Sequence, residues 1–185
     1  MNIAVFASGR GSNFEAIHSK IKSGEINAKI GCLISNNANA GAIDFANLNN
    51  ISTYSIDVKS TNSTLMLLEV LEKHEIQLIV LAGYMKLIPV EIVAQYENKI
   101  INIHPALLPS FGGKGCFGMN VHKKVWKSGV KFTGATVHFI NNKYDEGNII
   151  AQEIVPVLHT DSPEDIAKRV LKIEHQLFPK IVRQI

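Results

Sequence analysis

Short apolar segments alternate with amphipathic segments along the first hundred residues of the chain. The apolar segments have the length of buried strands, and the amphipathic ones repeat with the 3.6-residue period of a helix. The predicted strands are 1–7, 28–34, 51–54, 78–82 and 100–104. The predicted helices are a segment from residue 12, 40–48, 62–74 and 90–95. This alternation is typical of a parallel, doubly wound α/β sheet.

The pattern changes after Pro109, where a Gly-rich loop at 111–118 comes before a predicted helix at 120–128. The segments 131–140 and 149–157 read as two strands, close enough in sequence to pair antiparallel. A final helix is predicted from Pro163, with acidic residues in its first turn. We therefore expect an α/β fold with a mostly parallel, Rossmann-like sheet and an antiparallel C-terminal strand pair.

Two helices have a clear apolar stripe. In the 62–74 helix we expect Leu65, Leu68 and Leu71 to face the core, with Leu67 beside them. In the last helix the inward stripe is expected to consist of Ile166, Val170, Ile173 and Leu177. Glu174 lies off that stripe, so position alone favours a solvated residue.

Composition narrows the class of protein. The 185 residues are 46% hydrophobic, and we see no repeat or linker, so we expect a single domain over 1–185. The net charge of +3 and the absence of a long basic run disfavour nucleic-acid binding. No segment has the layout of a signal peptide or the length of a membrane span, so a cytoplasmic location with no membrane partner is expected. The two cysteines and seven histidines show no metal-ligand spacing, and we predict no metal.

A Gly-rich turn follows the first strand. Gly11, Ser12 and Asn13 lie between this strand and the next helix, where backbone N–H groups and the helix dipole attract a phosphate. Ser12 and Glu15 match a capping box. An ordinary tight turn is the alternative. Phe14 stands where a dinucleotide fingerprint has its third glycine, so a single phosphate fits better than a dinucleotide.

The strand at 100–104 carries the clearest chemistry. Asn102 and His104 are two residues apart, so they project from the same face near the strand's carboxyl end. Pro105 ends the strand beside the crevice in which open α/β sheets hold ligands. An amide donor and an imidazole together could stabilise an oxyanion.

Asp145, in the loop between the last two strands, is the third candidate. A carboxylate beside His104 would favour the imidazolium and could relay a proton, so the three residues suit acyl transfer without a covalent enzyme intermediate. Structural roles remain possible for each of them. His122 and His138 are weaker candidates for the same crevice.

Four motifs together, at 8–13, 82–87, 102–109 and 144–147, make this chain similar to the phosphoribosylglycinamide formyltransferases, a folate-dependent family of purine biosynthesis. The Asn-x-His-Pro-x-Leu-Leu-Pro motif is typical of transferases that use formyl-tetrahydrofolate. The turn at 11–13 points to the family that acts on glycinamide ribonucleotide.

The resemblance implies roles by position. It implies a catalytic trio of Asn102, His104 and Asp145, and a formyl donor, 10-formyltetrahydrofolate, as cosubstrate. Residues about 1–100 would hold the phosphate, and about 101–185 would supply catalysis and folate contacts. The implied contacts to glycinamide ribonucleotide are Gly11, Ser12, Asn13 and Glu174. The implied folate contacts are Met85, Lys86, Leu87, Ile88, Asn102, Asn141, Asn142, Lys143, Tyr144 and Asp145.

Two departures from the family pattern and two rival functions stay open. The helix at 62–74 lacks the arginine that meets the folate tail in many members, and Leu171 stands where the family often has glutamine. A formyltransferase or hydrolase acting on another formyl acceptor would use similar residues, although the phosphate turn argues against it. A non-catalytic nucleotide-phosphate binding module would need no such trio.

Overall fold

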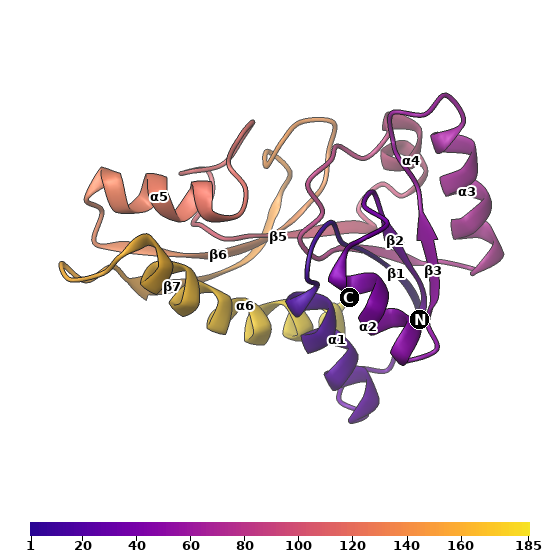
Figure 1. Cartoon of the computed structure of the whole chain (residues 1–185), viewed down its shortest axis with the longest axis horizontal. Coiled ribbons are helices and arrows are strands. Elements are labelled where there is room, and N and C mark those ends of the chain that lie inside the picture. Colours follow the sequence, from indigo (N-terminus) through magenta and orange to yellow (C-terminus); the bar gives the residue numbers. More distant parts are fainter.

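A computed structural model describes residues 1–185, and its centre is a seven-stranded sheet with helices on both faces (Figure 1). The strands are β1 Asn2–Phe6, β2 Lys29–Ser35, β3 Ser52–Ser55, β4 Leu78–Leu81, β5 Ile100–His104, β6 Phe132–Phe139 and β7 Ile149–Pro156. The helices are α1 Ser12–Lys22, α2 Gly41–Leu48, α3 Ser63–Lys73, α4 Val90–Gln95, α5 Met119–Ser128 and α6 Pro163–Gln184. Each predicted strand and helix is confirmed.

The strand order is β3-β2-β1-β4-β5-β6-β7. Strands β1 to β5 run parallel, β6 pairs antiparallel with β5, and β7 pairs antiparallel with β6. The predicted fold class is therefore confirmed. The order reverses beside β1, because the chain moves outward to β2 and β3 and then returns to β4 on the other side. Loops after β1 and β4 diverge at that point, and ligand crevices form there in open α/β sheets.

Both faces of the sheet are buried, which explains the nearly continuous apolar strands. Ile3 and Val5 belong to a core shared with α1, α2, α5 and α6. Ala4 and Phe6 point the other way, into a second core with α3 and α4. Figure 1 shows α6 lying along β6 and β7 toward α1. This long helix brings Glu174 against Asn13 at the start of α1, and its last turns lie beside the end of α1.

The apolar stripes were predicted with mixed success. In α6, Ile166, Val170 and Leu177 are buried and Ile173 is half-buried, as expected. In α3 the predicted stripe is partly wrong, because Leu65 is 62% exposed. The side chains that α3 buries are Ser63, Leu67, Val70 and Leu71. Several apolar residues in one helix offer more than one stripe, and contact with the sheet selects among them.

The N-termini of α1 and α6 differ in whether a side chain caps them, and this difference affects the site. A capping box was expected at α1, but Gly11 is its N-cap and no side chain caps the helix. The full capping box is found at α6, between Ser162 and Asp165. None of the six helices combines the length and apolar composition that crossing a membrane requires.

Candidate active site

A cleft of about 640 Å³ opens at the carboxyl ends of the parallel strands. The loops after β1, β4 and β5 form its walls, together with segments 113–118 and 140–145 and part of α6. All but one of the site residues expected from the sequence line this cleft. The exception is Asn142, which is exposed and is not part of the lining. Its neighbours Asn141 and Lys143, which were predicted with it, do line the cleft.

The turn after β1 occupies one end of the cleft. Gly11 has a φ of +87°, and a Cβ on it would lie 2.8 Å from the Cβ of Ala42. Both facts require glycine, because other residues strain in this conformation and would clash with α2. Since no side chain caps α1, the amides of its first turn are available to an anion.

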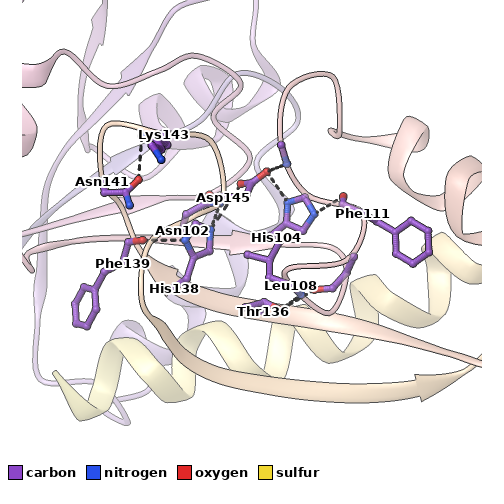
Figure 2. Close-up of polar contacts among 12 residues, drawn as sticks. Asn102, His104, Leu108, Phe111, Thr136, His138, Phe139, Asn141, Lys143 and Asp145 are labelled. Atoms are coloured by element: carbon purple, nitrogen blue, oxygen red, sulfur yellow. Dashed lines mark hydrogen bonds and ion pairs between the residues drawn. The ribbon is translucent and has the colours of Figure 1, made fainter.

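Asn102 and His104 lie at the end of β5, with the intervening Ile103 in the core. His104 is only 3% exposed, whereas Asn102 is half-buried, and both line the cleft. The ring of His104 lies between two groups (Figure 2). Its Nε2–H donates to the carbonyl of Phe111 at 3.0 Å, because a carbonyl can only accept. Its Nδ1 lies 3.6 Å from Oδ2 of Asp145.

Asp145 therefore meets His104 although 41 positions separate them in the sequence. Its Oδ2 also accepts the backbone N–H of Gly113 at 2.9 Å, which joins the Gly-rich loop to the site. Two glycines permit these approaches. A Cβ on Gly112 would lie 3.2 Å from Cβ of Asp145, and one on Gly147 would lie 1.8 Å from the carbonyl oxygen of Phe139.

His138 completes the cluster from β6, which pairs residue for residue with β5. It lies directly opposite Asn102 in the sheet, is fully buried, and its Nε2 lies 3.1 Å from Nδ2 of Asn102. Its Nδ1 donates to the Phe139 carbonyl at 2.8 Å, and its Nε2 lies 3.8 Å from Oδ1 of Asp145. Figure 2 shows Asp145 facing the two histidines with its two oxygens.

Burial dominates the electrostatics of the histidines. It lowers the pKa of His104, and the attraction of Asp145 and the Phe111 carbonyl only partly oppose this. Burial likewise lowers the pKa of His138 and, together with the charge of His104, lowers that of His122 to about 4. Asp145 favours the charged form of His104, as expected, but the loss of solvation outweighs its attraction, so the pKa of His104 is lowered overall.

Glu174 is the clearest correction to a position-based argument. It was expected on a solvated face, yet it is 7% exposed and lines the cleft. Its Oε2 accepts the side-chain N–H of Asn13 at 2.6 Å, joining α6 to α1. Burial raises the pKa of Glu174, against the opposing effect of this hydrogen bond. Glu174 lies off the main apolar stripe of α6, but it faces α1. The periodicity of α6 alone does not show that a second helix packs against that side.

The site predicted from the sequence does not include two lining residues, Cys116 and Tyr84. The buried Cys116 accepts a hydrogen bond from Lys124 at 2.8 Å, and the hydroxyl of Tyr84 is buried without a partner. His122 is buried with its Nδ1 unpartnered. Tyr84 lies in the motif at 82–87 and Cys116 in the Gly-rich loop, but nothing in either segment marks the residue itself as part of the site. For His138 the alternation of the 131–140 strand was a usable signal, and only the register against β5 makes it specific. No group of three or more acidic, histidine or cysteine side chains is arranged as a metal site.

The fold and the cleft define an enzyme class in which an amide, an imidazole and a carboxylate meet in a cleft that also contains the glycine turn after the first strand. This chain belongs to the formyl transferase family, whose model it matches over residues 1–182.

Within this family, the chain is similar to proteins named as phosphoribosylglycinamide formyltransferases. The chain is 44% identical to a chloroplastic phosphoribosylglycinamide formyltransferase of Vigna unguiculata, over 99% of this chain and 60% of that protein. It therefore spans less than two thirds of the length of that plant protein. It is 38% identical to the phosphoribosylglycinamide formyltransferase of Bacillus subtilis (strain 168), over 98% of this chain and 93% of that protein.

The fold is also similar to that of a solved structure with a related name. The glycinamide ribonucleotide transformylase 1 of Symbiobacterium toebii superposes with a TM-score of 0.91 and 35% identity. The match covers 99% of this chain and 86% of that one.

Proposed function

We propose that this protein transfers the formyl group of 10-formyltetrahydrofolate to the amine of glycinamide ribonucleotide. The observation that supports this most is the meeting of Asn102, His104 and Asp145 on one wall of the cleft, with 3.6 Å between the His104 ring and the carboxylate. The names of the relatives at 38–44% identity point to the same reaction.

The cleft has two ends suited to two substrates. At one end, Gly11, Ser12 and Asn13 would hold the phosphate, with Glu174 beside the glycinamide amine. At the other end, residues 85–88, 141 and 143–145 line a wall that would enclose the pterin. Asn102 and His104 lie on this lining too, where the formyl group and the amine would meet. Because each half of the chain contributes to both ends, the division near residue 100 stays a prediction.

Formyl transfer requires a hydrogen-bond donor to the formyl oxygen, a group that stabilises its negative charge, and a group that relays the amine proton. Asn102, His104 and Asp145 supply one group each. The amine nitrogen attacks the formyl carbon, and negative charge develops on the formyl oxygen. Asn102 would donate an N–H to that oxygen, and His104 would stabilise it as the charge raises the proton affinity of the ring. Asp145 would pair with the charged ring and relay the amine proton, which ends on the N10 atom of the departing tetrahydrofolate.

The buried, neutral state of His104 fits this sequence of events. A neutral ring can take up the proton that the attacking free amine loses as its bond to the formyl carbon forms, so the ring gains charge only as the oxyanion forms. That proton then passes by way of Asp145 to N10 as the bond between the formyl carbon and N10 breaks. In a site of low dielectric, that charge is stabilised more strongly than it would be in water. The proposed mechanism therefore keeps the imidazolium for the reaction itself rather than for the resting protein.

Direct assay tests the proposal. The purified protein is mixed with 10-formyltetrahydrofolate and glycinamide ribonucleotide, and both tetrahydrofolate and formylglycinamide ribonucleotide are measured. We expect the two products in equal amounts. Tetrahydrofolate and formate without the formylated nucleotide would instead support a hydrolase. Folate binding without turnover would support a binding module, and either outcome would reject the transferase.

An acceptor series tests the phosphate end. The unphosphorylated nucleoside of the same acceptor is compared with glycinamide ribonucleotide, and we expect a fall in kcat/KM of about 10²-fold or more, since each tenfold corresponds to about 1.4 kcal/mol. Equal values would reject the turn at 11–13 as the phosphate site. Some plant relatives are named as chloroplastic, so the cytoplasmic location expected from the sequence stays a prediction.

A further inference from the structure

The histidine on β6, His138, is not one of the three residues to which the proposed reaction assigns a role, yet it is hydrogen-bonded to the side chain of Asn102. It is fully buried and has hydrogen-bond partners at both ring nitrogens. Nδ1 faces the carbonyl of Phe139 at 2.8 Å, and a carbonyl oxygen cannot donate. In the neutral ring the proton therefore lies on Nδ1, and Nε2 must be an acceptor.

That tautomer dictates how the amide of Asn102 is turned. The group 3.1 Å from Nε2 has to be a donor, so it is the NH₂ end of the amide and not the oxygen. An NH₂ group has two hydrogens. One is held by His138, and the other remains available on the cleft side, where Asn102 is part of the lining.

We propose that His138 is a positioning residue, which fixes the amide of Asn102 as a hydrogen-bond donor toward the reacting formyl oxygen. This rests on the proposed function for the identity of the reacting group. The consequence is a dependence on one proton. If Nε2 became protonated, it would need an acceptor, and the amide of Asn102 would turn its oxygen inward and lose its role as oxyanion donor.

The groups around His138 determine the pH at which its Nε2 becomes protonated. Two titratable groups face it, Asp145 from the loop before β7 and His104 from β5, and its partner across β7 is the uncharged Ile149. Asp145 favours protonation of His138, whereas burial and His104 oppose it, and burial is the largest effect on its pKa. The ring thus stays neutral at neutral pH and its Nε2 remains an acceptor.

Two amide substitutions at His138 test the roles of its two ring nitrogens separately. In His138→Gln an amide oxygen can occupy the Nε2 position and accept from Asn102, whereas in His138→Asn the amide reaches only the Nδ1 position. We expect His138→Asn to lower kcat by about 10- to 100-fold, with KM changed less than about threefold, since losing an oxyanion donor costs up to about 10²–10³. His138→Gln should recover at least about tenfold of that loss. Equal kcat values for the two variants would overturn the proposal.

The pH dependence of activity distinguishes a positioning role from a structural one, because loss of a structural contact would not change the shape of the pH profile. The glutamine variant does not titrate, so its activity at pH 5.5 relative to pH 7.5 should exceed that of the wild type. The acid limb becomes shallower rather than flat, because His104 and Asp145 still titrate. An unchanged limb in His138→Gln would count against the proposal.

Two further measurements keep the test independent of folding and of the reaction itself. Nitrogen NMR of the wild-type protein with labelled histidine should show His138 protonated at Nδ1 and bare at Nε2 at pH 7.5, and the other tautomer would overturn the proposal. In an Asn102→Ala background, His138→Asn should cost less than about threefold more, because the group that His138 positions is gone.

The two proposals can fail separately. If the wild type shows the Nδ1 tautomer but transfers no formyl group, the proposed function fails while the hydrogen-bond assignment survives. If it transfers the formyl group and His138→Asn keeps full activity, only the positioning role fails.

Discussion

The two ends of the cleft are built from different materials. At the end that we propose binds phosphate (the phosphate end), the turn at 8–13 offers backbone amides, and its decisive residue, Gly11, has no side chain. At the end that we propose carries the chemistry (the catalytic end), the groups are side chains held by β5, β6 and the loop before β7. A backbone site depends on φ angles and close approach, so it is local in sequence. A side-chain site depends on strand register and burial, so its parts come from distant segments.

The difference predicts which changes each end tolerates. A change of side chain should be severe at the catalytic end, and an added Cβ should be severe at the phosphate end. The variants below contrast the two ends, or contrast the cleft with the rest of the molecule. Effects on kinetic constants come first and effects on stability follow, each from the largest expected effect to the smallest.

Asp145→Asn tests the catalytic end. The amide can still accept from Gly113, but it carries no charge to pair with His104 and cannot take up a proton. We expect kcat to fall by about 10²- to 10⁴-fold, the range of acid–base contributions. Glu146→Gln is the control, since its exposed carboxylate pairs with Lys143. Steady-state kinetics measure both, and an Asp145→Asn variant with nearly normal kcat would remove Asp145 from the mechanism.

Gly11→Ala tests the phosphate end. The new Cβ would lie 2.8 Å from Ala42 in a backbone conformation with φ +87°, so the turn has to shift. We expect the KM for the phosphorylated substrate to rise on the order of tenfold, equivalent to about 1.4 kcal/mol of binding.

Gly24→Ala is the matched control for this change. Gly24 has a φ of +80° with no atom within 4 Å of the added Cβ, and it lies outside the cleft lining. It should cost about 1 kcal/mol of stability for the strained φ without altering KM. An equal KM change in both variants would mean that general instability, and not the turn, controls binding.

Asp161→Asn tests an acid remote from the cleft. Asp161 accepts two hydrogen bonds from Arg169, at 2.6 and 2.8 Å, and one from the N–H of Leu158. Chiefly because of Arg169, its pKa falls to about 2. Its stabilisation is therefore present above the ordinary carboxyl pKa near 4 and is lost as the pH falls toward 2.

We expect Asp161→Asn to lower Tm by about 4–8 °C at pH 7, since charge-assisted hydrogen bonds contribute about 1–3 kcal/mol. The exposed Asp44→Asn is the control and should change Tm little. Calorimetry gives both values. A loss of kcat in Asp161→Asn with unchanged Tm would contradict the assignment of this acid to stability.

The smaller of the two stability effects concerns the loss of stability in acid. The pKa of His122 is about 4 in the folded protein and near 6.5 when unfolded, so below pH 6.5 the unfolded chain binds the extra proton first. Stability should therefore fall as the pH drops from 6.5 toward 4, by roughly 1–2 kcal/mol at pH 5 for this residue. His122→Leu should reduce the loss of Tm between pH 7.5 and 5. The exposed His159→Gln should not, and identical slopes in both variants would refute this role.

Local pattern determined much about this protein. Short continuous apolar runs place the buried strands, alternation places the strand at 131–140, and the 3.6-residue period places the helices. The alternation of elements predicts the doubly wound sheet and its antiparallel end. The turn at 11–13 and the pair Asn102 and His104 are likewise visible, since each lies within one short segment.

Tertiary structure decided what local pattern leaves open. The register of β6 against β5 sets His138 opposite Asn102, and the packing of α6 against α1 buries Glu174 beside Asn13. Burial also reverses the expected charge of His104, because solvation depends on every element around the ring. Contacts and dielectric surroundings are properties of the assembled fold, so a sequence can name the groups at this site but not their orientation or protonation.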